Sequence, residues 1–287
     1  MTVVAFGAAK GSPGVTTTVL ALAARWPAHR EPLVVEADPA GGDLVSRLTS
    51  LDGERGGLRE TPSTVQLAAS ARSGLSDQVV LEHLQRLPGP GEVRALVAPP
   101  SPFAASTAVT ALVAAGFGDR LRALAGLDAL VDVGRIDAAS PALHLVRWLG
   151  SVVLVARPTL SDVLHTRELV GSLRAAGVRA SLVLVGDRPY SPAEVIDTIG
   201  HAPLVGVLPD DPVGARALCG DAKSPKVLGR TRLVRAAGDL AARLAPAAPA
   251  AVPPPLIVTP PPAPPIAVPP PVPAPPPSWY EQAQVTS

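Results

Sequence analysis

The residues best suited to chemistry lie in a glycine-rich segment near the start of the chain. It reads Gly7-Ala8-Ala9-Lys10-Gly11-Ser12-Pro13-Gly14-Val15-Thr16-Thr17-Thr18. Glycines let a backbone approach an anion closely, and successive amide N–H groups in such a turn can point toward that anion. A threonine at the start of a following helix can bind Mg²⁺ beside a phosphate. The segment therefore predicts a phosphate-binding loop, with a plain turn between a strand and a helix as the alternative.

Carboxylates follow two further apolar runs, in Val34-Val35-Glu36-Ala37-Asp38-Pro39-Ala40-Gly41-Gly42-Asp43 and in Leu130-Val131-Asp132-Val133-Gly134-Arg135. A carboxylate at the carboxyl end of a strand, facing a phosphate, is suited to holding a metal-bound water. The alternative is capping, because Asp38 or Asp43 could accept hydrogen bonds from free amides at a helix start. We favour the functional interpretation for Asp38 and the capping interpretation for Asp43.

The elements that must position these residues are short and alternate along the chain. Apolar runs typical of strands cover Val3–Phe6, Leu33–Glu36, Val93–Val97, Ala129–Val133, Val152–Ala156, Leu182–Val185 and Leu204–Leu208. They lack polar alternation, as expected for strands buried on both faces of a parallel sheet. Apolar residues at helical spacing indicate helices over Val15–Arg25, Leu160–Ala176 and Thr231–Leu244, and Ser63–Arg72 could form a short helix.

This alternation predicts an α/β fold, with a doubly wound, mainly parallel sheet of seven to eight strands and helices on both faces. Such sheets bind ligands at the carboxyl ends of their strands. The glycine-rich segment and both acidic segments fall at these ends.

Together these segments resemble the MinD/ParA family of P-loop ATPases, which carry a deviant Walker A loop, commonly Lys-Gly-Gly-x-Gly-Lys-Thr-Thr. The resemblance runs from about residue 2 to residue 245. Lys10 falls on the signature lysine of the family, and Gly11, Gly14, Thr16 and Thr17 match its loop. Two positions differ from the pattern, namely Ser12, which replaces a Gly, and Val15, which replaces the second lysine, while Pro13 stands at the variable position.

The resemblance implies a role for each matched residue. Lys10 would reach the phosphates of a partner chain across a nucleotide-sandwich dimer. Thr16 would bind Mg²⁺, and Thr17 would contact phosphate. Asp38 would lie near the γ-phosphate and orient the attacking water, while Asp132 would support Mg²⁺ through a water. Gly134 would sense the γ-phosphate as a switch.

Two later segments correspond to the part of the family that holds the base. Gly206-Val207-Leu208-Pro209-Asp210-Asp211 is similar to the family's Gly-x-Ile-Pro-x-Asp segment, which lies against the base and ribose. Pro209, Asp211 and Asp187 are therefore expected to bind nucleotide. Asp187 stands where the family has a base-reading Asn. Because an amide both donates and accepts hydrogen bonds whereas a carboxylate only accepts, the identity of the base stays open.

The resemblance implies an ATP-Mg²⁺ switch that dimerises and controls localisation, of the chromosome-partitioning or cell-site-positioning type. Val15 removes a positive charge from the phosphate site and with it transition-state stabilisation, so hydrolysis of ATP to ADP should be weak or absent. Arg135 could partly compensate. The alternative is a non-enzymatic scaffold that recruits partners through its C-terminal segment.

Composition limits the class of protein. The chain has 25 Lys+Arg and 24 Asp+Glu, a net charge of +1, which disfavours binding to nucleic acid through bulk charge. Its single Cys219 cannot form an internal disulfide or a thiol cluster for zinc. The first residues lack the pattern of an export signal. We therefore expect a cytoplasmic protein. Arginines fringe Thr231–Leu244, but core packing of that helix is favoured over contact with nucleic acid or membrane.

Nearly half of the chain's 35 prolines fall in residues 246–287. We expect a P-loop domain over 1–245 and a disordered proline-rich tail over 246–287, because a polyproline segment cannot bury a core. The tail ends in Ser278-Trp279-Tyr280-Glu281, which could dock a protein partner or be an accidental aromatic end of a spacer.

Overall fold

The computed structural model describes residues 2–48, 57–87, 92–221 and 229–245. The compact unit runs from Met1 to Ala248. The predicted proline-rich tail over 246–287, with its Trp279-Tyr280 end, lies outside the described residues.

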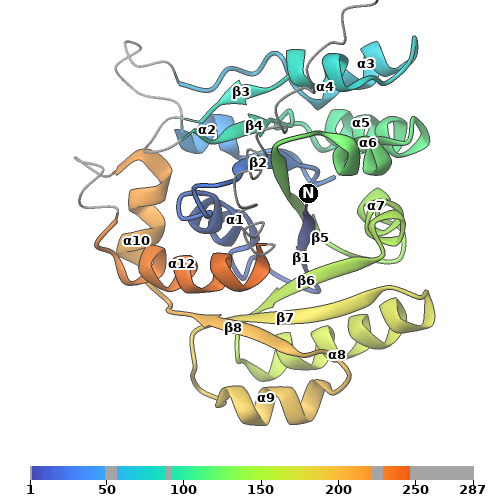
Figure 1. The fold of residues 1–287 in the computed structure, drawn as a ribbon. Helices are drawn as coiled ribbons and strands as arrows, with labels where there is room; N and C mark the ends of the chain where they lie inside the picture. Colours follow the sequence, from blue (N-terminus) through green and yellow to red (C-terminus); the bar gives the residue numbers. More distant parts are fainter. Residues whose placement is uncertain (1, 49–56, 88–91, 222–228, 246–287) are drawn as a thin grey trace, which may run out of the picture. The chain divides into compact units, whose positions relative to one another are not determined.

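A sheet of eight strands forms the centre of the described part, in the order β3-β4-β2-β5-β1-β6-β7-β8 (Figure 1). The strands are β1 (Val3–Ala8), β2 (Glu31–Glu36), β3 (Gln85–Arg86), β4 (Arg94–Leu96), β5 (Leu127–Arg135), β6 (Ser151–Ala156), β7 (Arg179–Val185) and β8 (Leu204–Leu208). Neighbouring strands are parallel except β3 and β4. The predicted doubly wound, mainly parallel α/β fold is confirmed. The edge strand β3 was not predicted, because two residues are too few to give a pattern.

The helices lie on both faces of this sheet (Figure 1). They are α1 (Val15–Ala23), α2 (Leu44–Leu48), α3 (Thr64–Ala71), α4 (Asp77–Glu82), α5 (Pro102–Ala114), α6 (Phe117–Ala123), α7 (Pro141–Leu149), α8 (Leu160–Ala175), α9 (Pro192–Ile199), α10 (Pro212–Arg216), the π-helical turn η1 (Ala217–Asp221) and α12 (Arg232–Leu244). Several begin at a Ser or Thr whose side chain accepts a backbone N–H, as Ser63 does for α3 and Thr231 for α12.

Each face of the sheet has its own apolar core, because successive side chains along a strand point to opposite faces. In β2, Leu33 and Val35 belong to one core and Val34 to the other. Helices α5, α7 and α8 cover the first core, and α1 and α12 cover the second. The buried face of α12 explains its helical apolar spacing. In the described residues, no helix has the length and hydrophobicity that a membrane span requires.

Strand β1 lies between β5 and β6, and the order of the strands reverses beside it. From β1 the chain crosses to β2 on one side, whereas β6, β7 and β8 extend the sheet on the other. Such a reversal opens a crevice at the carboxyl ends of the strands, where doubly wound proteins bind their ligands. The loop between β1 and α1 starts at this point.

Candidate functional site

The loop from β1 to α1 depends on two glycines with left-handed backbones. The φ angles of Gly11 and Gly14 are 66° and 103°, and a Cβ on Gly11 would meet nothing within 4 Å. The glycines are therefore required by backbone conformation rather than by crowding. No side chain caps the start of α1 at Gly14. The first amides of this helix thus have no side-chain acceptor, as a site for an anion requires.

Thr16 connects this helix start to the end of β5. Its Oγ1 donates a hydrogen bond of 2.6 Å to Oδ2 of Asp132, although the two residues are 116 positions apart in the sequence. The other oxygen of Asp132 accepts the backbone N–H of Gly134 at 2.9 Å. Asp132 itself is buried, with 2% of its surface exposed. The predicted Mg²⁺ ligand and its predicted supporting carboxylate are therefore in direct contact.

Asp38 reaches the same place from the end of β2. A Cβ built on Gly134, whose φ is 59°, would collide with the Asp38 carboxyl group. One Asp38 oxygen accepts the N–H of Ala40 at 2.8 Å, which fixes the side chain in a local turn. Asp38 therefore closes a turn within its own loop rather than capping a helix start, and it also lies against the predicted switch glycine.

Burial and mutual repulsion shape the ionisation of these carboxyl groups. Burial raises the pKa of Asp132 to about 6, and the charge of Asp38 adds to the rise, whereas hydrogen bonds from Thr16 and Gly134 oppose it. Burial also raises the pKa of Asp38. Desolvated carboxylates that repel one another favour a cation, which would restore both to the charged form.

Glu36 has a structural task in this region. Its Oε1 accepts the N–H groups of Asp43 and Leu44 at 2.7 and 2.8 Å, and its Oε2 accepts that of Ala98 at 2.9 Å. Burial raises its pKa to about 7. Glu36 thus satisfies the amides at the start of α2, so the predicted capping role of Asp43 is wrong. Asp43 instead pairs with Arg47 at 2.8 Å, because the next turn of α2 brings that guanidinium within reach.

Arg47 is the residue that the sequence reasoning missed. Its positive charge lowers the pKa of Asp132, so its guanidinium acts on the site. Arg135, which was expected to compensate at the phosphates for the charge that Val15 removes, lies exposed at the end of β5. The one signal in the sequence was the spacing of four between Asp43 and Arg47, which favours a pair on a helix.

The remaining loop residues differ in their surroundings. Lys10 is exposed, and its Nζ donates to Oγ of Ser161, at the start of α8, at 3.4 Å. Ser12 is exposed, Pro13 is buried and Thr17 is half-buried. Val15 is 7% exposed and packs in the core shared by α1 and α12. An apolar side chain therefore occupies the position at which the family pattern has its second lysine.

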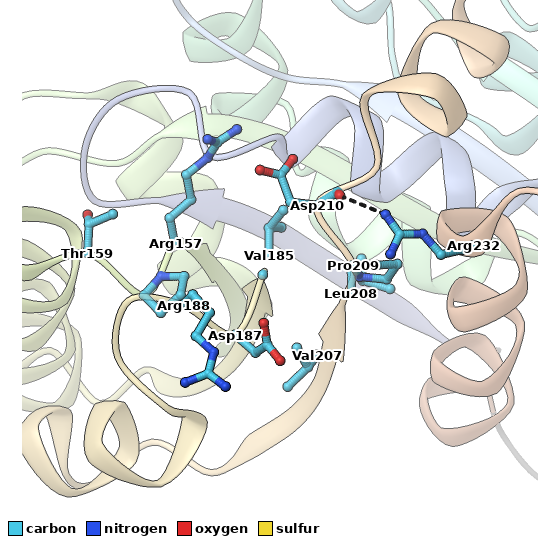
Figure 2. Close-up of a pocket in the computed structure, with 12 residues that line it drawn as sticks. Arg157, Thr159, Val185, Asp187, Arg188, Val207, Leu208, Pro209, Asp210 and Arg232 are labelled. Atoms are coloured by element: carbon cyan, nitrogen blue, oxygen red, sulfur yellow. Dashed lines mark hydrogen bonds between the residues drawn. The ribbon is translucent and has the colours of Figure 1, made fainter.

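A pocket of about 520 Å³ lies at the carboxyl ends of β6, β7 and β8 (Figure 2). Its lining residues are Arg157, Pro158, Thr159, Val185, Gly186, Asp187, Arg188, Val207, Leu208, Pro209, Asp210 and Arg232. The structure thus brings the predicted nucleotide contacts Asp187 and Pro209 to one cavity. Asp211 is not among the lining residues. Its carboxyl group caps α10, accepting the N–H of Gly214 at 3.0 Å and of Leu233 at 3.1 Å.

The oxygen atoms that gather at the start of α1 fit a magnesium site. Mg²⁺ prefers hard oxygen ligands and often takes only one or two from protein, the rest coming from phosphates and water. Thr16 supplies a hydroxyl, and Asp132 and Asp38 supply carboxylates. Across the described residues, no group of three or more His, Cys, Asp or Glu side chains is arranged to hold a metal by itself.

Solved structures share this architecture over most of the chain. A ParA family ATPase from Chlorobium tepidum matches with a TM-score of 0.63 and 19% identity, over 84% of this chain and 98% of that one. The chain has the fold of the ParA and MinD ATPases. MinD from Pyrococcus horikoshii, complexed with Mg-ADP, matches with the same TM-score and identity, over 84% and 94% of the two chains.

A third neighbour, the McdA–ATP complex from Cyanothece, matches with a TM-score of 0.61 and 12% identity, over 85% of this chain and 96% of that one. No protein-family model and no curated protein sequence matches the chain. The MinD/ParA resemblance read from the sequence motifs thus agrees with the fold.

Proposed function

We propose that the chain is a MinD/ParA-like switch that binds a nucleoside triphosphate with Mg²⁺ and dimerises in that state. The observation that carries the proposal is the contact of Thr16 with Asp132, and of Asp38 with Gly134, beside the uncapped start of α1. Support also comes from the fold, which is that of a MinD complexed with Mg-ADP and of a McdA complexed with ATP.

Each residue has a task in this proposal. The N–H groups of Gly11, Ser12 and residues 14–17 would bind phosphate oxygens, whereas Pro13 has no N–H to donate. Thr16 with Asp132 would hold Mg²⁺. The metal, when bound, would offset phosphate charge. Asp38 would accept a hydrogen bond from a water near the γ-phosphate, and its contact with Gly134 would report whether that phosphate is present. Lys10 is exposed, as a residue that reaches a partner chain must be.

Hydrolysis of the bound triphosphate should be slow. The family resemblance implies ATP, but the base depends on the pocket at the ends of β6, β7 and β8, where Asp187 replaces the base-reading Asn of the family. Val15 is buried and carries no charge, so the loop lacks a cation on the β- and γ-phosphates. A switch that hydrolyses slowly would dwell in its triphosphate state. We propose a cytoplasmic role in partitioning or in positioning at a cell site, with the segment 246–287 recruiting a protein partner.

The second candidate is a scaffold that does not turn over nucleotide and recruits partners through the same segment. The burial of Val15 in the core of α1 and α12 favours it, because the loop position is then used for packing. The two candidates differ in whether nucleotide controls assembly.

Calorimetry with Mg²⁺ and ATP, ADP or GTP tests the proposal on the full chain, with light scattering to measure dimerisation. We expect micromolar affinity, nucleotide-dependent dimers, and loss of the dimers in Lys10→Ala. Val15→Lys should gain hydrolysis, whereas the neutral, similarly long Val15→Met should not. Failure of every nucleotide to bind below millimolar concentration would contradict the switch and leave the scaffold.

A further inference from the structure

Asp187 is presented to the pocket of Figure 2 by a fixed turn at the end of β7. Gly186 precedes it with a φ of 87°, a left-handed conformation that favours glycine. The N–H of Gly186 donates to the carbonyl of Leu208 at 2.8 Å, and that of Tyr190 donates to the carbonyl of Pro158 at 3.3 Å. The turn is thus tied to the ends of both neighbouring strands, which holds Asp187 in place.

The Asp187 side chain is exposed and has no hydrogen bond or ion pair with any other described residue. Its two oxygens are therefore free to accept hydrogen bonds from a ligand. In the view of Figure 2, Asp187 lies on one side of Val185 and Asp210 on the other, so the two carboxyl groups enter the pocket separately. A pair of oxygens on one carboxylate best matches a ligand with two donors side by side.

Apolar surfaces suited to a flat ring complete the pocket. Val207 is 36% exposed and Pro209 is half-buried, so both present apolar surface to the pocket, whereas Pro158 and Leu208 are buried. The volume of about 520 Å³ is within the range of sites for small molecules. Arg157 and Arg188 also line the pocket, and no hydrogen bond or ion pair joins either guanidinium to another described residue.

Guanine and adenine differ in their hydrogen-bond donors and acceptors, so such a pocket can distinguish them. Guanine has N1–H and N2–H₂ donors next to each other, and O6 and N7 as acceptors on its other edge. A carboxylate can accept both donors, and an arginine can donate to O6 and N7. Adenine offers only its N6–H₂ group to a carboxylate and places the N1 lone pair against it. Adenine carries its N6–H₂ group where guanine carries O6. An arginine placed to donate to O6 would therefore face another donor when adenine is bound.

We infer that this pocket selects guanine over adenine and that Asp187 reads the base, an inference that rests on the proposed function of nucleotide binding. Asp187 accepts the N1–H and N2–H₂ groups, and an arginine of the pocket, Arg157 or Arg188, donates to the O6 side. The ring lies against Val207 and Pro209.

The test is calorimetry of the full chain with Mg²⁺ and guanosine, adenosine or xanthosine diphosphate. We expect the guanosine compound to bind at least about ten-fold more tightly than the other two, as a matched pair of hydrogen bonds allows. Asp187→Asn should lose the preference for guanosine diphosphate and bind xanthosine diphosphate more tightly than the wild type does. The reason is that an amide can donate to the O2 atom that xanthine has in place of the amino group of guanine. Asp210→Asn, with the same charge change in the same pocket, should keep the wild-type order.

Equal affinities, or tighter adenosine binding, in the wild type would overturn the inference and leave the switch standing. So would an Asp187→Asn variant with an unchanged order of affinities. If neither the nucleotides nor inorganic tripolyphosphate binds, the phosphate site itself is absent and the proposed function fails first. The preference of the wild type for guanosine over xanthosine diphosphate is a readout that does not depend on any variant folding.

Discussion

At the scale of residues, Asp132 has the most demanding position. It is 2% exposed, next to Asp38, and bonded to Thr16 and Gly134. Burying a carboxylate costs free energy unless donors or a cation compensate, and here the donors compensate only in part, since the pKa remains raised to about 6. The site is thus built to accept a positive charge, and Arg47 supplies some of it.

This position predicts how stability depends on pH. The folded state holds the Asp132 proton up to about pH 6, whereas the unfolded state releases it near pH 3.8. Stability that this group contributes at low pH is therefore lost as pH rises between these values, about 2–3 kcal/mol in all. For the nucleotide-free chain, the free energy of unfolding measured with urea should fall between about pH 4 and 7. We expect Asp132→Asn to remove the part of this fall that Asp132 causes.

A matched control is Asp137→Asn, since Asp137 is exposed in the loop that follows β5. That variant should follow the wild-type curve. Glu36, whose pKa burial raises to about 7, should leave a remaining decline in every variant. A decline in Asp132→Asn as large as in the wild type would show that Asp132 titrates normally.

At the scale of elements, the loops that follow β1, β2 and β5 pack closely against one another. Gly134 shows this most clearly, because the Asp38 carboxyl group occupies the space that a side chain would need. Gly150, which ends α7, has a similar φ of 71° and open space around it. The two glycines therefore separate the effect of backbone conformation from the effect of crowding.

Replacing each of the two glycines by alanine should give different losses of stability. Gly150→Ala should lower the free energy of unfolding by about 1 kcal/mol, the cost of a left-handed alanine. Gly134→Ala should lower it by roughly 1–3 kcal/mol more, because Asp38 must also move. Urea unfolding measures both. Equal losses would mean that Asp38 does not pack against Gly134.

At the scale of the whole molecule, the compact unit ends at Ala248. Its two cores lie on the faces of one sheet, and α12 closes the second of them. Helix α12 ends at Leu244, so the described elements of the fold and the residues of the candidate site all precede the proline-rich segment 246–287.

A chain that ends at Ala248 should keep its nucleotide affinity and shift its melting temperature by less than about 2 °C, under roughly 1 kcal/mol. It should also lose the protein partners that the full chain recovers, if the segment docks them. Melting measured by circular dichroism, with recovery of partners by affinity purification, checks both expectations. Unchanged partners would favour a plain spacer, and a large fall in melting temperature would mean that the segment packs on the unit.

The parallel sheet and its main strands could be predicted from the residues alone, because a strand buried on both faces is a continuous apolar run of neighbouring residues. The loop could also be predicted, since glycine at positions 11 and 14 meets a backbone requirement that is itself local. The contacts between side chains far apart in the sequence could not be predicted and became clear from the folded arrangement. Glu36 rather than Asp43 accepts the first amides of α2, the charge of Arg47 lowers the pKa of Asp132, and the Asp211 carboxyl group caps α10. Each of these outcomes depends on how neighbouring strand ends and helices lie in space, and spacing along the chain does not record that.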